Sequence, residues 1–168
     1  MRKGFTLVEY LIYIVIFGLL SSTLLFAASR FITLLRQTHL LREMQDDARL
    51  VGEEIAQEAQ NALSIYTPTS VFNTSPGQVS LETKSYLPTG ETTTYVDFYL
   101  ASKGIYRKRE GSSPTRLTSQ GIEVTSFVVR HLTQAQTPAL RIEYSLDSKD
   151  LPGGPIPFTI TASLRPNK

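Results

Sequence analysis

The residue with the clearest potential for chemistry is a single carboxylate, Glu9, which stands at the head of a long apolar run. It is the only charged residue between Lys3 and Arg30. A carboxylate in a membrane-spanning helix costs up to about 2.5–3.5 kcal/mol at mid-membrane and less near an end, so such a group usually has a partner or a function. The position of Glu9 therefore predicts a partner or a function for this carboxylate.

The rest of the sequence offers little for catalysis. There is no cysteine and there are only two histidines, with no tryptophan. The lack of cysteine excludes disulfides, thiolate zinc sites and cysteine nucleophiles, although it does not identify the compartment. No cluster of catalytic residue types stands out, so we expect no enzymatic activity, no cofactor and no metal site.

Length and charge suit one ordinary domain with an attached segment. The chain has 168 residues, of which 17 are basic and 15 acidic. The basic residues thus exceed the acidic ones by two, and Arg2 and Lys3 account for this excess. Without these two, 15 basic residues remain, equal to the acidic count. A neutral chain gives no general case for binding nucleic acid.

The apolar run is long enough to span a lipid bilayer. From Tyr10 to Ser29 there are 20 consecutive uncharged residues, and as a helix they would cover roughly 30 Å, the thickness of the hydrocarbon core. Arg2 and Lys3 precede the run closely, so we expect the N-terminus to stay in the cytoplasm and the rest of the chain to lie outside.

A secretory signal peptide is the competing interpretation of this segment. Such a signal has a shorter apolar core and a small-x-small cleavage site, and the stretch from Ala27 to Ser29 would serve as one. The run before it is long, however, and Glu9 sits where the core of a signal would begin. A permanent membrane helix is the interpretation that we favour.

The stretch KGFTLVE, from Lys3 to Glu9, resembles the processing site of type IV prepilins and their relatives, the type II secretion pseudopilins and competence pilins. The resemblance implies that a prepilin peptidase cuts after Gly4 and methylates the new N-terminal amine of Phe5. Arg2 and Lys3 would be the charges of the short leader. The combination of basic leader, small residue, aromatic residue, glutamate and long apolar helix is far more specific than a short motif alone.

The same resemblance gives Glu9 a partner. In this family the glutamate of one subunit pairs with the N-terminal amine of an adjacent subunit during filament assembly, here the amine of Phe5. A charge pair in a low dielectric depends strongly on register, because leaving either charge unpaired is expensive. The positive end of the helix dipole also favours an anion near the N-terminus. The alternative is a carboxylate that only snorkels to the cytoplasmic interface.

The helix is expected to continue beyond the membrane as an amphipathic segment. No proline interrupts residues 5–63. Apolar residues recur every three or four positions, which predicts one face packed on a soluble domain. This stripe consists of Leu41, Met44, Ala48, Val51, Ile55, Ala59 and Ala62. Charged residues on the other faces are Arg42, Glu43, Asp46, Asp47, Arg49, Glu53, Glu54 and Glu58.

Beyond Leu63 the composition changes to that of a β-rich domain. Alternating apolar and polar residues predict strands, and the period-two stretches are 79–82, 95–100, 122–132, 140–146 and 158–164. A hairpin turn is expected at residues 102–104, leading into residues 105–109. Short sequential strands favour antiparallel pairing, with one sheet face covering the helical stripe.

The predicted fold is therefore α+β, a long N-terminal helix packed on a C-terminal antiparallel β-sheet head, as in pilins. The expected organisation has four parts: a leader at 1–4, a transmembrane and assembly helix at 5–29, an amphipathic helix at 30–63 and a globular head at 64–168.

A second, looser resemblance concerns the head. The order of Leu117, Thr118, Gly121, Ile122, Val124 and Phe127, followed by an extended stretch at 140–144 and preceded by 104–107, is similar to the J-type minor pseudopilin and the W-type minor pilin. These strand patterns are degenerate and cover residues 94–147. They imply a minor rather than a major subunit.

Two weaker signals concern ligands of the head. Arg107, Lys108 and Arg109 could contact DNA phosphates, but three basic residues on a strand edge more often form a solvated face that guards against aggregation. Asp147 and Asp150, with Glu143 nearby, could bind calcium, although their spacing lacks a dense oxygen cluster.

Together these features predict a structural subunit of a type IV pilus or related pseudopilus. Its partners would be other pilin or pseudopilin subunits, the prepilin peptidase, the membrane assembly platform and the lipid bilayer. The rival interpretation is a membrane-anchored extracytoplasmic binding module, an adhesin or DNA-uptake receptor with a pilin-type signal. It would show an exposed aromatic or basic patch on the head and would tolerate loss of Glu9. The sequence does not distinguish pilus, secretion and competence systems.

Overall fold

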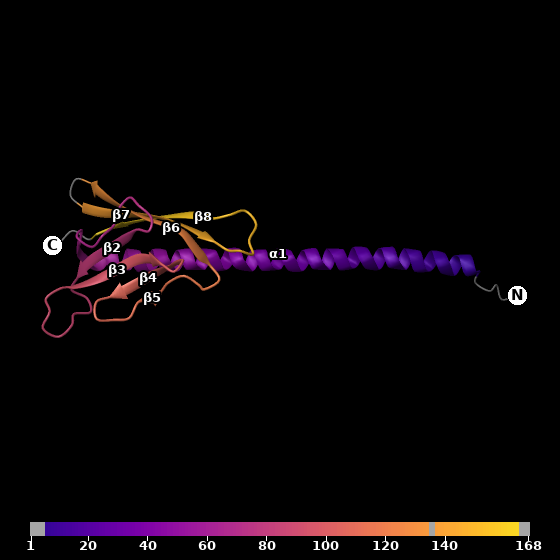
Figure 1. The fold of residues 1–168 in the computed structure, drawn as a ribbon, viewed down its shortest axis with the longest axis horizontal. Coiled ribbons are helices and arrows are strands. Elements are labelled where there is room, and N and C mark those ends of the chain that lie inside the picture. The colour runs from indigo at the N-terminus through magenta and orange to yellow at the C-terminus, as the bar shows by residue number, and fades with distance from the viewer. Residues whose placement is uncertain (1–5, 135–136, 165–168) are drawn as a thin grey trace. The chain divides into compact units, whose positions relative to one another are not determined.

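The computed structural model describes residues 6–134 and 137–164 and confirms the α+β prediction. A long apolar helix is followed by antiparallel strands, and Figure 1 shows both sheets along the C-terminal part of the helix. The chain divides into two compact units, Met1–His39 and Leu40–Lys168.

Helix α1 spans Leu7–Asn61 without a break. The prediction ran two residues too far at the C-terminal end, because Ala62 already pairs with Thr83 as the first residue of a strand. The hydroxyl of Thr83 donates to the carbonyl of Asn61 (3.1 Å), which satisfies one of the carbonyls that a helix end leaves without a partner.

The first sheet is an antiparallel meander in the order β1-β2-β3-β4-β5. Its strands are β1 Ala62–Ile65, β2 Gln78–Thr83, β3 Thr94–Ala101, β4 Gly104–Arg109 and β5 Thr115–Arg116. The predicted turn between β3 and β4 is confirmed: Ala101 pairs with Gly104, and Ser102 and Lys103 both have positive φ, 45° and 56°. Two such residues are what a two-residue hairpin turn of type I′ requires.

The second sheet has three antiparallel strands, β6 Glu123–Gln134, β7 Thr137–Asp147 and β8 Ile156–Ser163. The five period-two stretches of the sequence thus lie in strands, except for Ile122 and Leu164, which fall just outside β6 and β8. The short strands β1 and β5 were not predicted. Nor was the division into two sheets, because the sequence pattern predicted one sheet face over the helix.

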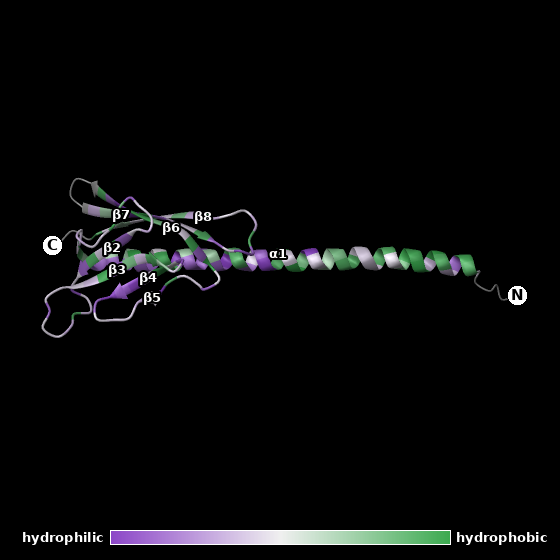
Figure 2. Ribbon diagram, in the orientation of Figure 1, coloured by the Kyte–Doolittle hydropathy of each residue, from purple (hydrophilic) through white to green (hydrophobic). Residues whose placement is uncertain are grey.

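The core lies between the sheets and the C-terminal part of α1. The predicted stripe is confirmed except at its first residue: Leu41 is exposed, and the helix buries Met44, Ala48, Val51, Ile55 and Ala59. Figure 2 shows the change along α1 from a mostly hydrophobic sequence in its N-terminal part to a mixed one in its C-terminal part. From the strands, Phe98, Ile105, Phe127, Ile142 and Leu146 complete the core.

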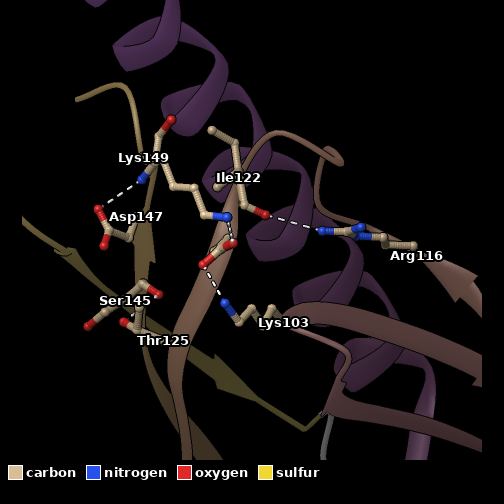
Figure 3. A network of polar contacts seen from close by, with 9 residues as sticks. Lys103, Arg116, Ile122, Thr125, Ser145, Asp147 and Lys149 are labelled. Atoms are coloured by element: carbon tan, nitrogen blue, oxygen red, sulfur yellow. Dashed lines mark hydrogen bonds and ion pairs between the residues drawn. The ribbon is translucent and has the colours of Figure 1, made fainter.

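Polar contacts join the two sheets where the β3–β4 turn meets β6. The amide of Val124 donates to the carbonyl of Lys103 (3.0 Å). The carboxylate of Glu123 accepts the ammonium of Lys103 (2.8 Å) and lies 3.6 Å from that of Lys149. Figure 3 shows these two lysines converging from different loops. The two ammonium groups lower the pKa of the Glu123 carboxyl, chiefly through the hydrogen bond from Lys103.

Candidate functional site

The side chains of Thr6 and Glu9 form a reciprocal pair at the start of α1. The amide of Thr6 donates to Glu9 Oε2 (2.9 Å), and the amide of Glu9 donates to Thr6 Oγ1 (3.4 Å). The hydroxyl of Thr6 also donates to Glu9 Oε2 (3.1 Å). With α1 beginning at Leu7, Thr6 is the N-cap and Glu9 is the third helical residue, which is the arrangement of a capping box.

The capping box places the Glu9 carboxylate at the positive end of the helix dipole. Both contacts from Thr6 go to Oε2. Oε1 has no hydrogen bond or ion pair within residues 6–134 and 137–164. Oε2 of Glu9 therefore holds the start of the helix in place.

The surface around and beyond Glu9 is apolar. Large hydrophobic side chains are exposed from Leu7 to Leu35 along α1, and α1 is long and apolar enough to cross a membrane by length and composition. The hydroxyls of Thr23 and Ser29 donate to the carbonyls of Leu20 and Phe26 (both 2.8 Å). Bonds of this kind satisfy polar groups inside their own helix, as an environment without water requires.

The remaining predicted site residues lie outside the described part of the chain. These are the leader charges Arg2 and Lys3, the cleavage position Gly4, and Phe5, the predicted site of cleavage and N-methylation. Their roles stay predictions from the sequence.

In the second unit, Asp47 of α1 connects the helix to the loop after β5. Its Oδ2 accepts the amide of Ser119 (2.7 Å) and its Oδ1 accepts the Ser119 hydroxyl (2.9 Å). Burial raises the pKa of the Asp47 carboxyl above its ordinary value, the two bonds from Ser119 opposing that shift. Nearby, the buried hydroxyl of Tyr144 donates to the carbonyl of Ala48 (2.9 Å), and burial raises its pKa.

The prediction of a solvated basic strand edge at residues 107–109 is wrong for two of the three residues. Strand β5 pairs with β4 at Tyr106 and Arg107. Arg107 bonds Glu54, and Arg109 bonds Glu58 (2.8 Å). Lys108 alone is exposed. Since the helix already neutralises both arginines, these three residues do not form a basic surface for DNA phosphates.

The ion pair of Arg109 and Glu58 is largely buried, and hydrogen bonds satisfy only some of its polar atoms. The Glu58 side chain is 3% exposed and that of Arg109 28%. Arg109 also lies over the ring of Tyr86, with its guanidinium carbon 3.8 Å from the ring centroid. Glu58 Oε2 and Arg109 Nε are buried without a hydrogen-bond partner in the described residues.

The residues proposed to bind calcium, Asp147, Asp150 and Glu143, do not form a metal-binding group in the structure. Among the described residues, no group of three or more histidine, aspartate or glutamate side chains could hold a metal ion. Glu143 is instead paired with Arg130 (3.3 Å) and Arg141 (3.0 Å).

Three polar residues of the molecule were missed by the sequence analysis. Thr6 was detectable, because Thr-x-x-Glu before an apolar run is the pattern of a capping box. Asp47 and Glu58 were placed on the solvent-facing sides of the helix but are buried, 7% and 3% exposed. Their partners Ser119 and Arg109 lie 72 and 51 residues away in sequence, so helical periodicity could not identify them.

Comparison with known proteins bears on the N-terminal unit, Met1–His39. Residues 1–25 match a family model described as the prokaryotic N-terminal methylation motif. Neither the curated proteins nor the solved structures give a match to the chain. The motif and the long apolar helix support a membrane-anchored precursor of the kind that a prepilin peptidase processes. The chain thus opens with the N-terminal methylation motif of pilin-like precursors.

Proposed function

We propose that this protein is a non-enzymatic, minor structural subunit of a type IV pilus or a related pseudopilus. The prepilin peptidase cuts it after Gly4 and methylates the amine of Phe5. The subunit then leaves the membrane through the assembly platform and enters the filament helix-first. Until then α1 anchors it with its N-terminus in the cytoplasm and its head outside.

The observation that carries the proposal is the setting of Glu9. Its carboxylate lies in the first turn of a 55-residue helix whose exposed apolar side chains begin at Leu7. The capping box leaves Oε1 without a bond in the described chain. The methylated amine of Phe5 on an adjacent subunit supplies a matching charge, and hydrophobic contact between helices supplies cohesion without fixing register.

The assembly follows from the geometry of repeated contacts. A pair between Glu9 of one subunit and the amine of the next is head-to-tail, and such contacts build open helical filaments when the rotation does not close a ring. The minor class rests on the similarity of residues 94–147 to J-type pseudopilins and W-type minor pilins.

The anchored binding module remains the second candidate because of the head. Tyr95 and Tyr99 of β3 and Tyr106 of β4 lie on the sheet face turned away from the core, and the last two rings stack at 5.9 Å. This aromatic surface is a feature that the binding module requires. The two candidates differ in their response to loss of Glu9: a binding module tolerates it, whereas a filament subunit does not.

The test compares the full-length protein with Glu9→Ala and Glu9→Gln in cells that assemble the filament. Glu53→Gln, which removes an exposed charge elsewhere on α1, is the matched control. We expect all three variants to be cleaved and inserted in the membrane. Both Glu9 variants should enter sheared filaments about tenfold less than wild type, equivalent to about 1.4 kcal/mol, and Glu53→Gln should behave as wild type. Normal incorporation of both Glu9 variants would refute the assembly role and favour the binding module.

A further inference from the structure

A pocket of about 230 Å³ lies on the outward face of the five-stranded sheet. Tyr66 and Tyr95 form its aromatic part, and Asp97, Lys108 and Glu110 its charged part. It belongs wholly to the second unit. Nothing in the proposed assembly through Glu9 uses it.

The alternation of β3 creates this pocket. Thr94, Val96 and Phe98 are buried on the inner face, so Tyr95 and Asp97 point outward. Across the ladder, Glu82 of β2 is opposite Tyr95. Tyr66 follows β1 directly, and its ring centroid lies 4.8 Å from that of Tyr95 at an interplanar angle of 50°. Two tilted tyrosine rings therefore form one wall.

The charges around these rings are mostly negative. Glu110 is held in place, since its Oε2 accepts the Thr94 hydroxyl (3.2 Å) and the Tyr95 amide (3.3 Å). Burial, then the charge of Glu82 and further groups including Glu110 and Glu91, raise the pKa of the Tyr95 hydroxyl. Lys108 is the one basic residue that lines the pocket within the described chain.

Asp97 is a carboxylate of the pocket that has no bonding partner among the described residues. It lies directly opposite Lys108 in the ladder, yet neither side chain forms a hydrogen bond or an ion pair anywhere in residues 6–134 and 137–164. The pocket thus offers two aromatic faces and an unpaired carboxylate on a rigid strand.

Another part of the same unit shows what such a combination binds. There the Arg109 guanidinium lies 3.8 Å from the ring centroid of Tyr86 and bonds the Glu58 carboxylate at 2.8 Å. On the outer face the tyrosines and the carboxylates are present without the guanidinium.

We propose that the pocket between Tyr66, Tyr95 and Asp97 binds the guanidinium of an arginine side chain on a partner polypeptide. The planar cation stacks on a tyrosine face while its N–H groups reach the Asp97 carboxylate. A lysine ammonium is a compact, strongly hydrated charge that lacks the planar stacking surface, so the site prefers arginine. The net negative surroundings favour a cationic partner over a neutral one.

The experiment is an NMR titration of the full chain in detergent micelles, with tyrosine rings labelled with ¹³C. The probe is Nα-acetyl-arginine methylamide. The matching citrulline compound, which is neutral, and the lysine compound are the comparisons. We expect the arginine compound to shift the Tyr66 and Tyr95 ring signals saturably, with the buried Tyr144 ring as an internal reference. The citrulline and lysine compounds should bind at least about fivefold more weakly.

Two variants make the assignment specific. Asp97→Asn should weaken binding of the arginine compound about fivefold, whereas Asp150→Asn, at an exposed position outside the pocket, should leave it unchanged. An unshifted Tyr144 signal shows that each variant is folded. Equal binding of the citrulline or lysine compound, the absence of a saturable shift, or unchanged affinity in Asp97→Asn would overturn the proposal. None of these outcomes depends on filament assembly.

Discussion

Thr6 and Glu9 cap the first turn of α1 by bonding each other's backbone amide, the former through Oγ1 and the latter through Oε2. This arrangement gives the carboxylate an orientation before any second subunit is present. A carboxylate fixed at the helix start loses less side-chain entropy when it meets an amine. Glu9, the one charge in the apolar run, thus also caps the helix to which it belongs.

Loss of the cap should weaken assembly without abolishing it. Thr6→Ala removes both side-chain contacts of Thr6, and N-cap substitutions of this kind cost about 0.5–2 kcal/mol. We expect less protein in sheared filaments than for wild type but more than for Glu9→Ala. Thr6→Ser, which keeps the hydroxyl, is the control and should assemble normally. Because Thr6 is close to the cleavage site, intact mass must first show that both variants are processed. A Thr6→Ala protein that assembles like wild type would argue against a role for the cap.

The buried pair of Glu58 and Arg109 should stabilise the head, whereas an exposed pair on the same helix should not. Glu58→Ala leaves Arg109, whose side chain is 28% exposed, without its carboxylate. We expect a loss of about 2–3 kcal/mol in the free energy of unfolding, measured by urea denaturation of the full chain in detergent. The control is Glu53→Ala, since the side chains of Arg49 and Glu53 are 78% and 62% exposed. It should cost about 0.5 kcal/mol or less. Equal losses in the two variants would contradict this account.

The pH dependence of stability should carry a contribution from Asp47. Burial raises the pKa of its carboxyl from the ordinary value of 3.8, so the folded state holds this proton more tightly than the unfolded state. Its contribution to stability is therefore fully present below pH 3.8 and is lost as the pH rises through the pKa of the folded state. Asp47→Asn removes the ionisation and can keep both contacts with Ser119, because an amide both accepts and donates.

The measurement for Asp47 is the free energy of unfolding of wild type and Asp47→Asn from pH 3 to pH 7. The stability of wild type relative to the variant should fall as the pH rises, which separates this group from all carboxylates common to both proteins. Asp47→Ala, which loses both contacts with Ser119, should be about 2 kcal/mol less stable than wild type at neutral pH. A wild type that gains stability over Asp47→Asn with rising pH would show that Asp47 is stabilised as an anion instead.

The hydrogen bond from Tyr144 to α1 should be measurable by removing one oxygen atom. Tyr144 is 1% exposed and its hydroxyl donates to the carbonyl of Ala48 at 2.9 Å. Tyr144→Phe keeps the ring in the core and should lower the free energy of unfolding by about 1 kcal/mol. Tyr106→Phe is the control because Tyr106 is a partly exposed residue whose hydroxyl makes no hydrogen bond in the described chain. This substitution should change stability by about 0.5 kcal/mol or less. Similar effects of the two substitutions would mean that the Tyr144 bond contributes nothing net.

Periodicity made most of the fold predictable. The alternation at residues 95–100 and the helical stripe from Met44 to Ala59 both depend on local spacing, and both are confirmed. Strand β5 has two residues and β1 has four, too few for an alternation to stand out. The two-sheet arrangement depends on which strands pair, which periodicity does not encode.

The charged residues were harder to predict than the apolar ones. A carboxylate can be buried only where a partner compensates its desolvation, and the partners of Asp47 and Glu58 come from distant parts of the chain. The basic triplet at residues 107–109 was misjudged for the same reason: alternation turns Arg107 and Arg109 towards α1 and Lys108 away from it. The Thr6–Glu9 cap, by contrast, is local and could have been predicted from its spacing.

The most direct test of the account is the intact mass and N-terminal sequence of the membrane-extracted protein, from cells with and without prepilin peptidase. We predict a chain that begins at N-methylated Phe5 only when the peptidase is present, and one that retains Met1 when it is absent. That result would place a methylated amine four residues before Glu9 in the chain. A chain that begins near Arg30, or that keeps Met1 in both kinds of cell, would contradict the account, and the function would then have to be sought in the head alone.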